Sequence, residues 1–376
     1  MFLICSYWIS ILPGMEQALP PSPRKGRGAV SNPDGRFESK SRFAVHDGWD
    51  IDDDDLPPLR THVTDHPCKT VISRNASPDI PFEQSINPYQ GCEHGCVYCF
   101  ARPSHSYLGL SPGLDFETRI TAKPNAAETL ARELRHPAYK PSPIMLGANT
   151  DPYQPIERER GITREILEVL AAHNHPVAIV TKSALVERDL DILGPMASKG
   201  LAGVGVSVTT LDGALARTLE PRAAAPAKRL RTIRRLSGAG VPVSVLAAPM
   251  IPFLNDHELE RILSAAKDAG ATGAGYILLR LPRELKDLFT EWLQTHAPGK
   301  AKHVLNNLRQ NRDGQLYVAD FGIRMTGTGE MAEILRKRFH IACKNLGLNA
   351  ERTEDFDLDT TQFSPPLMPG DQLSFF

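Results

Sequence analysis

The chain has 376 residues, of which 41% are hydrophobic, so it can bury one large core and still has spare length at both ends. Its 43 Lys and Arg residues are balanced by 44 Asp and Glu residues, which gives a formal net charge of -1. This balance excludes a uniformly basic surface for nucleic acid or membranes, so any nucleic-acid role would rest on a local patch.

The first twelve residues are apolar, but they lack a basic leader and a cleavage site and are too short to span a bilayer. Because Met15 follows closely, we interpret the run as a mis-assigned start or an apolar tail, with the true start at Met1 or Met15. We expect no other segment to cross a membrane, and we place the protein in the reducing cytoplasm. Cys5, Cys68 and Cys343 are then most simply free thiols.

Residues 1–80 are predicted to form an N-terminal extension that is mostly disordered or draped over the body of the protein. Its prolines, basic residues and the acidic run Asp52–Asp55 follow neither the helical nor the strand period. We assign no chemistry to this extension.

The first stretch with an evident chemical task holds three of the six cysteines, Cys92, Cys96 and Cys99, in the spacing C-x3-C-x2-C. A disulfide would leave one thiol over. A structural zinc site would need a fourth ligand, either His94 inside the loop or a distant cysteine. A four-iron cluster held by three cysteines leaves one iron open to a small molecule. Ligand number and spacing favour the cluster over zinc and over a disulfide.

Residues 81–298 alternate between short apolar runs and amphipathic segments. The predicted strands are 144–148, 177–180, 204–208, 241–246 and 275–281. The predicted helices are 125–136, 163–173, 185–198, 227–237, 255–269 and 282–296. Near-continuously apolar strands joined to helices by short loops indicate a parallel sheet covered by helices, as a barrel or as an open doubly wound sheet.

Two further amphipathic helices, 300–310 and 330–346, lie in a predicted C-terminal helical extension over residues 299–348. Residues 349–376 are polar and contain prolines, and we expect them to form a mobile tail.

Polar side chains follow several strands, at the end where such folds place their chemistry. The candidates are Thr150, Asp151, Tyr153, Gln154, Glu157, Lys182, Ser207, Thr209 and Arg222. An ordinary turn, a surface lysine and satisfied strand hydroxyls are the structural alternatives. The helix at 227–237 carries five basic residues, which we interpret as a solvated face rather than a phosphate-binding patch.

The cysteine loop, its adjoining aromatic residues and the strand–helix units that follow resemble the radical S-adenosylmethionine (SAM) superfamily. The resemblance implies an α/β fold with a partial (β/α)6 TIM-like barrel over residues 81–298. It also implies a 4Fe-4S cluster on Cys92, Cys96 and Cys99. On this cluster SAM would be reductively cleaved to a 5′-deoxyadenosyl radical that abstracts hydrogen from a substrate. An external donor of the flavodoxin or ferredoxin type would supply the electron.

The same resemblance suggests which residues contact SAM. Tyr98 would lie beside the adenine, while Thr150, Asp151 and Glu157 are candidates for the SAM amine. The other implied cofactor-binding residues are Lys182, Ser207 and Thr209. Tyr153, Gln154 and Arg222 are candidates for contacting the substrate.

Four further motifs, Asn-Thr-Asp-Pro-Tyr-Gln-Pro-Ile-Glu, Leu-Glu-Pro-Arg, Ala-Pro-Met-Ile-Pro and Leu-Arg-Leu-Pro, resemble the branch related to spore photoproduct lyase, often labelled "DNA repair photolyase". That branch suggests a DNA-linked substrate, for repair or modification. RNA, a peptide or a small molecule is the alternative, and a non-catalytic, metal-stabilised nucleic-acid-binding module is a second one. Spore photoproduct lyase uses a barrel cysteine as hydrogen donor, a position that only Cys343 could fill here, by folding back.

The last six residues, Asp371–Phe376, resemble the Gln-Leu-x-Leu-Phe peptide with which bacterial repair and replication proteins bind the DNA sliding clamp. The residues expected to contact the clamp are Gln372, Leu373, Phe375 and Phe376. A Gln, a Leu and two aromatics on a mobile tail suit an apolar groove. The alternative is a tail that folds onto its own domain.

Overall fold

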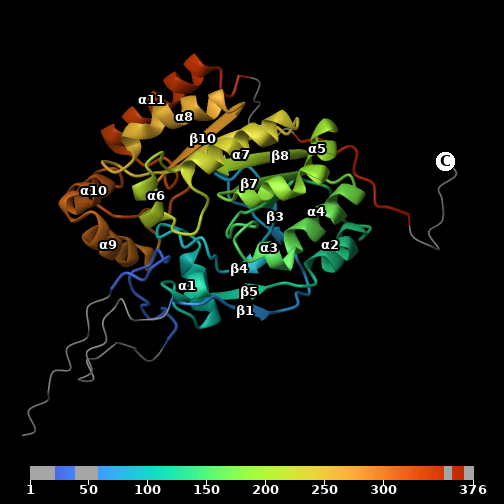
Figure 1. The fold of residues 1–376 in the computed structure, drawn as a ribbon, viewed down its shortest axis with the longest axis horizontal. Coiled ribbons are helices and arrows are strands. Elements are labelled where there is room, and N and C mark those ends of the chain that lie inside the picture. Colours follow the sequence, from blue (N-terminus) through green and yellow to red (C-terminus); the bar gives the residue numbers. More distant parts are fainter. Residues whose placement is uncertain (1–21, 39–57, 351–357, 368–376) are drawn as a thin grey trace, which may run out of the picture.

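The computed structural model describes residues 22–38, 58–350 and 358–367 (Figure 1). The four tail residues predicted to bind the sliding clamp, Gln372, Leu373, Phe375 and Phe376, lie outside the described residues. None of the helices in the described ranges has both the length and the apolar character needed to cross a membrane.

The core of the fold is a seven-stranded sheet with the order β10-β9-β8-β7-β6-β3-β2. Its strands are β2 (Ser73–Arg74), β3 (Gln84–Ile86), β6 (Ile144–Leu146), β7 (Val177–Thr181), β8 (Ala202–Ser207), β9 (Val243–Met250) and β10 (Gly273–Leu278). Every pairing from β3 to β10 is parallel, and only the edge strand β2 is antiparallel. The carboxyl ends of the parallel strands therefore meet on one side of the sheet.

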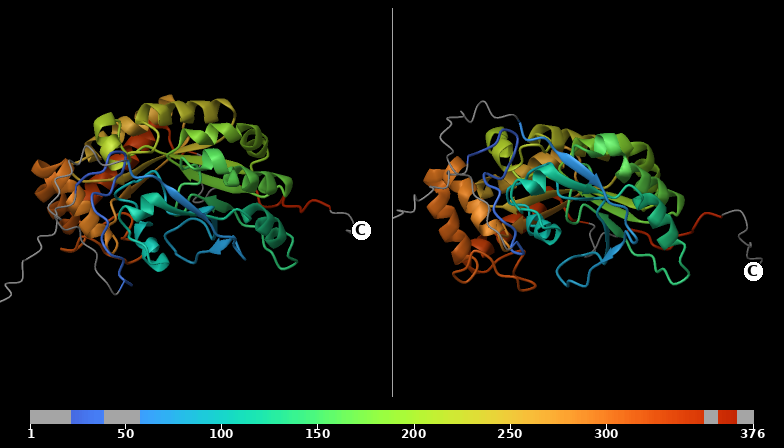
Figure 2. Two further views of the ribbon diagram at one scale, coloured as in Figure 1. Left: turned by 60° about the horizontal axis from the view of Figure 1, so that its bottom comes forward. Right: turned by 90° about the horizontal axis from the view of Figure 1, so that it is seen from below.

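The helices that join these strands pack against one face of the sheet, and the sheet curves around the other face (Figures 1 and 2). They are α2 (Ala126–Leu134), α4 (Ile162–Ala172), α5 (Leu190–Ser198), α7 (Pro226–Gly238) and α8 (Leu259–Asp268). In α4 the residues at helical spacing, Ile166, Leu167 and Leu170, are fully buried in the same apolar cluster as Val177 and Ile179 of β7. The expected parallel α/β architecture is confirmed.

Three helices extend this body: α9 (Leu285–His296), α10 (Pro298–Gln310) and α11 (Gly329–Leu346). Two of the expected helices begin differently than predicted. A 3-10 turn, η3 (Ala184–Asp189), precedes α5, and another, η4 (Asp256–Glu258), precedes α8. Asn255, the first residue of the helix predicted over 255–269, makes no capping bond with its side chain. It accepts from the Ile251 amide (2.6 Å) and donates to the Thr209 carbonyl (2.7 Å).

A second, small sheet contains the strands before and after the cysteine loop and was not predicted. It pairs β1 (His62–Asp65) with β5 (Arg119–Ala122) and β5 with β4 (Tyr89–Gln90). Between β4 and β5 run the loop, η2 (Arg102–Leu108) and α1 (Asp115–Thr118). The remaining short helices are α3 (Glu157–Arg160) and α6 (Gly213–Leu219). Because these elements have two to seven residues, they show too few periods to be detected from sequence.

The two edges of the large sheet are connected by the segment between α10 and α11. Its Met325 carbonyl accepts from the Leu278 amide of β10 (2.9 Å), and Arg324 Nε donates to Asp79 Oδ2 (2.7 Å) just beyond β2. In Figure 2 this segment and the loop after β2 lie next to each other at the open side of the sheet. These two bonds therefore link the edges of the sheet across the side that a partial barrel leaves open.

Candidate active site

A cavity of about 190 Å³ lies at the carboxyl ends of the parallel strands. Its lining includes all three loop cysteines and four of the other residues selected from the sequence, namely Tyr98, Asp151, Lys182 and Ser207. These residues come from the loop and from the ends of β6, β7 and β8, so the parallel topology is what brings them together.

The backbone of the cysteine loop is held by a buried arginine. Arg102, fully buried, donates through Nε to the Cys96 carbonyl (2.8 Å) and through Nη2 to the Gly95 carbonyl (3.0 Å). Its charge is paired with the fully buried carboxylate of Glu117 (2.5 Å). Neither residue was selected from the sequence, because partners fifteen residues apart leave no periodic signal.

The described part of the N-terminal extension contacts the same loop. The amides of Gly28 and Ala29 donate to the two Glu117 oxygens (2.9 and 2.8 Å). At Gly28 a Cβ atom would lie 1.8 Å from the Gly95 carbonyl oxygen, so no larger residue fits without a backbone shift. Arg27 donates to the Glu117 carbonyl (2.9 Å). Residues 27–30 therefore pack directly on the loop that carries the cysteines.

Two of the residues selected after β6 support the loop from the other side. Gln154 donates to the Gly91 carbonyl (3.1 Å) and accepts from the Glu93 amide (2.8 Å). Thr150 donates to the Tyr89 carbonyl (2.8 Å). Both side chains are buried and neither lines the cavity. They position the loop.

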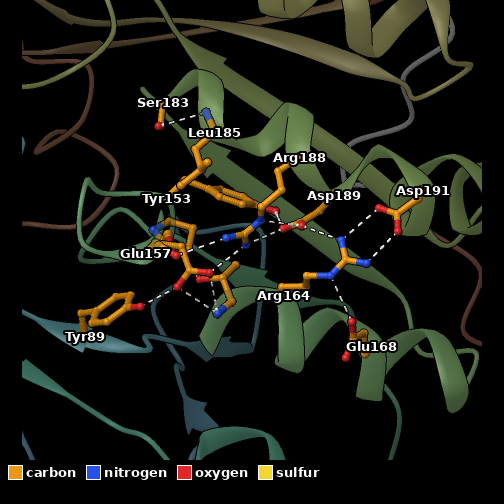
Figure 3. Close-up of polar contacts among 12 residues, drawn as sticks. Tyr89, Tyr153, Glu157, Arg164, Glu168, Ser183, Leu185, Arg188, Asp189 and Asp191 are labelled. Carbon is orange, nitrogen blue, oxygen red and sulfur yellow. Dashed lines mark hydrogen bonds and ion pairs between the residues drawn. The ribbon is translucent and has the colours of Figure 1, made fainter. Parts of the chain in front are cut away.

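Glu157 and Tyr153 belong to a buried polar cluster away from the cavity (Figure 3). Glu157 accepts from Tyr89, from the Thr163 amide (3.1 Å) and from Arg188 (2.8 Å). Tyr153 donates to Asp189 (3.0 Å). Burial, followed by the charge of Glu157, raises the pKa of Tyr89 far above its usual range. This cluster joins α3, α4 and η3 beneath the site.

Asp151 is the carboxylate that faces the cavity. It accepts from the Thr181 hydroxyl and from the Lys182 amide (both 2.7 Å), and His94 Nδ1 lies 3.2 Å from its Oδ2. Burial alone would raise the pKa of Asp151, but His94 and these hydrogen bonds hold it at about 2. Asp151 is therefore a fixed negative charge that can receive a cation such as an amine.

A second buried carboxylate, Glu220, supports the opposite wall. It accepts from Tyr98 and from Thr209 (2.6 Å), and it forms an ion pair with Arg229. Burial would raise the pKa of Glu220, but Arg229 and then Lys182 hold it at about 2. Arg229 was grouped with the solvated arginines of its helix and is in fact 1% exposed, because it pairs with an acid outside its own helix.

Lys182 lies between these groups, with its Nζ 5.8 Å from the centre of the Tyr98 ring. Burial disfavours the charge of Lys182, but the negative charges of Cys96, in its thiolate form, and of Glu220 more than offset this, so the pKa of Lys182 is raised. Thr209 does not line the cavity, and Arg222 pairs with Glu93 (3.1 Å) on the far side of the loop. Of the basic candidates selected from the sequence, Lys182 thus faces the cavity and Arg222 does not.

The donor set of the cavity fits a cluster better than a single ion. Burial raises the pKa of Cys96 to about 12, and that of Cys92 rises well above its usual range, so both remain thiols until a metal replaces the proton. Within the described ranges no three His, Cys, Asp or Glu side chains converge as one ion would require. A four-iron cluster takes one thiolate per iron, so cysteines spaced around a shared cavity suit it.

A parallel α/β barrel with three cysteines at the carboxyl end of its strands defines a class of metal-cluster enzymes. Residues 86–266 match the sequence model of the radical SAM superfamily. An uncharacterised protein of Mycobacterium bovis is 37% identical over 235 residues, 61% of this chain and 69% of that protein. One from Methanocaldococcus jannaschii is 29% identical over 173 residues, 46% of this chain and 62% of that protein. The chain belongs to the radical SAM superfamily.

Solved structures of spore photoproduct lyase have the same fold as this chain. One, a mutant of that enzyme, aligns with a TM-score of 0.57 at 16% identity, covering 76% of this chain and 80% of the other. The structure of the lyase complexed with dinucleoside spore photoproduct aligns with a TM-score of 0.56 at 15% identity, with the same coverage of both chains. These matches confirm the predicted partial TIM-like barrel.

The chain is therefore a radical SAM enzyme, a class that uses a 4Fe-4S cluster and SAM and takes its electron from an external donor. When bound, these two cofactors supply a 5′-deoxyadenosyl radical.

Proposed function

We propose that Cys92, Cys96 and Cys99 bind the 4Fe-4S cluster and that SAM occupies the adjoining cavity. The observation that supports this most directly is that all three cysteines line one cavity together with Asp151 and Lys182. The cluster ligands, a fixed negative charge and a fixed positive charge thus share one space. Such an arrangement suits a molecule that carries an ammonium and a carboxylate group.

The charges suggest how SAM is oriented. Asp151 is an anion held by His94 and Thr181, so it receives the amine. Lys182 pairs with the carboxylate, and Ser207 is in reach of a hydroxyl because it lines the same cavity. Tyr98 offers an aromatic face to the adenine. Thr150, Glu157 and Thr209 act through positioning, since each is engaged with protein groups.

We infer a DNA-linked substrate, modified or repaired by hydrogen abstraction. Two features support this: the resemblance of the last six residues to sliding-clamp-binding peptides, and the fold shared with a lyase whose structure holds a dinucleoside spore photoproduct. Cys343 lies in α11, packed in the core near Phe339, and does not line the cavity. We therefore do not propose Cys343 as a hydrogen donor. A flavodoxin or ferredoxin is the proposed electron source.

The test is anaerobic reconstitution with iron and sulfide, followed by reduction in the presence of SAM and detection of 5′-deoxyadenosine. We expect wild-type protein to form it and Cys96→Ala to form none, because the cluster loses a ligand. Cys68→Ala, which removes a half-buried thiol that does not line the cavity, is the matched control and should behave as wild type. Cleavage by Cys96→Ala at the wild-type rate would disprove the ligand assignment.

A further inference from the structure

Arg280 follows β10 and lines the cavity. Lys182, which lines the same cavity, follows β7, three strands away in the sheet. The one hydrogen bond of Arg280 to the described residues is from Nη1 to the sulfur of Met325 (3.1 Å), a weak acceptor. Its Nε is buried and has no acceptor there. Arg280 is half-buried, so most of the five donors of its guanidinium make no bond to the described residues and are open to a ligand in the cavity.

A second arginine lies close behind it. Arg312 is 1% exposed and donates to the carbonyls of Leu279 (2.7 Å) and Arg324 (3.2 Å). Its Nε also has no acceptor among the described groups. Burial, and after it the charge of Arg280, lower the pKa of Arg312 to about 10. The two positive charges therefore act on each other.

No carboxylate in the described part of the chain pairs with Arg280 or Arg312. The fully buried arginines elsewhere differ in this respect, because Arg102 pairs with Glu117 and Arg229 with Glu220. Arg312 is buried and Arg280 is half-buried. A buried charge without a counter-ion is costly, so a cavity wall that holds this pair is suited to receive an anion from outside.

The group beside Arg280 indicates what the anion is attached to. The Arg280 guanidinium lies 5.1 Å from the centre of the Phe100 ring, which also lines the cavity and is 43% exposed. An exposed aromatic face next to an arginine is the pattern with which proteins hold a base and its phosphate. We propose that Arg280, backed by Arg312, binds a phosphate of a nucleotide substrate whose base packs on Phe100.

We assign the carboxylate of SAM to Lys182 rather than to Arg280. Lys182 follows β7, and β7 is separated from β10 by β8 and β9. At about 4.8 Å between neighbouring strands, the two strand ends are about 14 Å apart along the sheet, so the two cations enter the cavity from well-separated positions. Lys182 is the cation near Cys96, where the proposed function, on which this inference rests, places the amino-acid part of SAM.

The experiment uses the full chain, reconstituted with its cluster and saturated with SAM, and a short fluorescein-labelled oligothymidylate as probe. We expect Arg280→Gln to weaken binding at least about tenfold and to lower the salt slope of the binding constant by about one. Arg280→Lys should lie in between, because it keeps the charge but loses the planar fork. Arg234→Gln, at an exposed arginine of α7, is the control and should bind as wild type.

Competition with unlabelled thymidine monophosphate and with thymidine tests the phosphate itself. The monophosphate should compete better than thymidine. If the monophosphate competes as well as the unlabelled oligothymidylate, the substrate is a free nucleotide. If the monophosphate competes more weakly than the unlabelled oligothymidylate, the substrate is a strand. The proposal fails if wild type cleaves SAM but does not bind the probe, or if thymidine competes as well as its monophosphate. It also fails if Arg280→Gln lowers SAM affinity more than probe affinity. Wild type that cannot cleave SAM would instead refute the proposed function.

Discussion

Replacing Glu220 by Gln removes the negative charge that compensates Arg229 inside the protein while keeping the shape of the side chain. The pKa of Glu220 is lowered from 4.5 to about 2, which corresponds to about 3 kcal/mol in favour of the charged form at about 1.4 kcal/mol per pKa unit. Removing one partner of a buried ion pair typically costs about 3–5 kcal/mol. Because Arg229 keeps the carbonyls of Ala224 and Ser207 as acceptors, we expect the lower value.

The assay is urea unfolding of the anaerobic protein, in which a loss of about 3 kcal/mol lowers the midpoint by about 1 M for a slope of about 3 kcal/mol/M. The control is Glu187→Gln, which breaks the ion pair between Glu187 and Arg235. Because Arg235 is 70% exposed, this substitution should cost less than about 1 kcal/mol. Adding Arg229→Met to Glu220→Gln should recover part of the loss, since both charges are then gone. Equal effects of Glu220→Gln and Glu187→Gln would refute the reasoning.

Gly28→Ala should lower the iron and sulfide bound per chain and reduce the free energy of unfolding by about 1–3 kcal/mol, because the added Cβ would meet the Gly95 carbonyl. The control is Gly213→Ala, where an added Cβ meets no other atom within 4 Å. Normal cluster content in Gly28→Ala would show that residues 27–30 do not support the loop. The fully buried His175 has a pKa lowered to about 4, chiefly by burial. The unfolded chain binds this proton near pH 6.5, so stability should fall by up to about 3 kcal/mol between pH 6.5 and 4. In His175→Gln the urea midpoint should vary less over that range, and an unchanged pH profile would contradict this.

The order of strands and helices was predictable because the buried strands are continuous apolar runs and the helices show one apolar face. The cavity cysteines were predictable from their spacing, and Asp151, Lys182 and Ser207 from their positions at strand ends. The roles of Glu157, Tyr153 and Gln154 were not, because a turn with several polar residues does not reveal which of them points inward. Their partners, Tyr89, Asp189 and the loop backbone, are remote in sequence.

Arginines show most clearly where sequence reasoning stops and structure is needed. Arg102, Arg229 and Arg280 all occur beside apolar residues, and nothing in their local sequence separates them. In the structure the first two are neutralised by Glu117 and Glu220, and both support the walls of the cavity. Arg280 faces the same cavity without such a partner among the described residues. Because burying a charge is tolerable only when something compensates it, we interpret an arginine paired with a buried acid as structural. A half-buried arginine at a cavity wall without such an acid is the better candidate for binding a ligand.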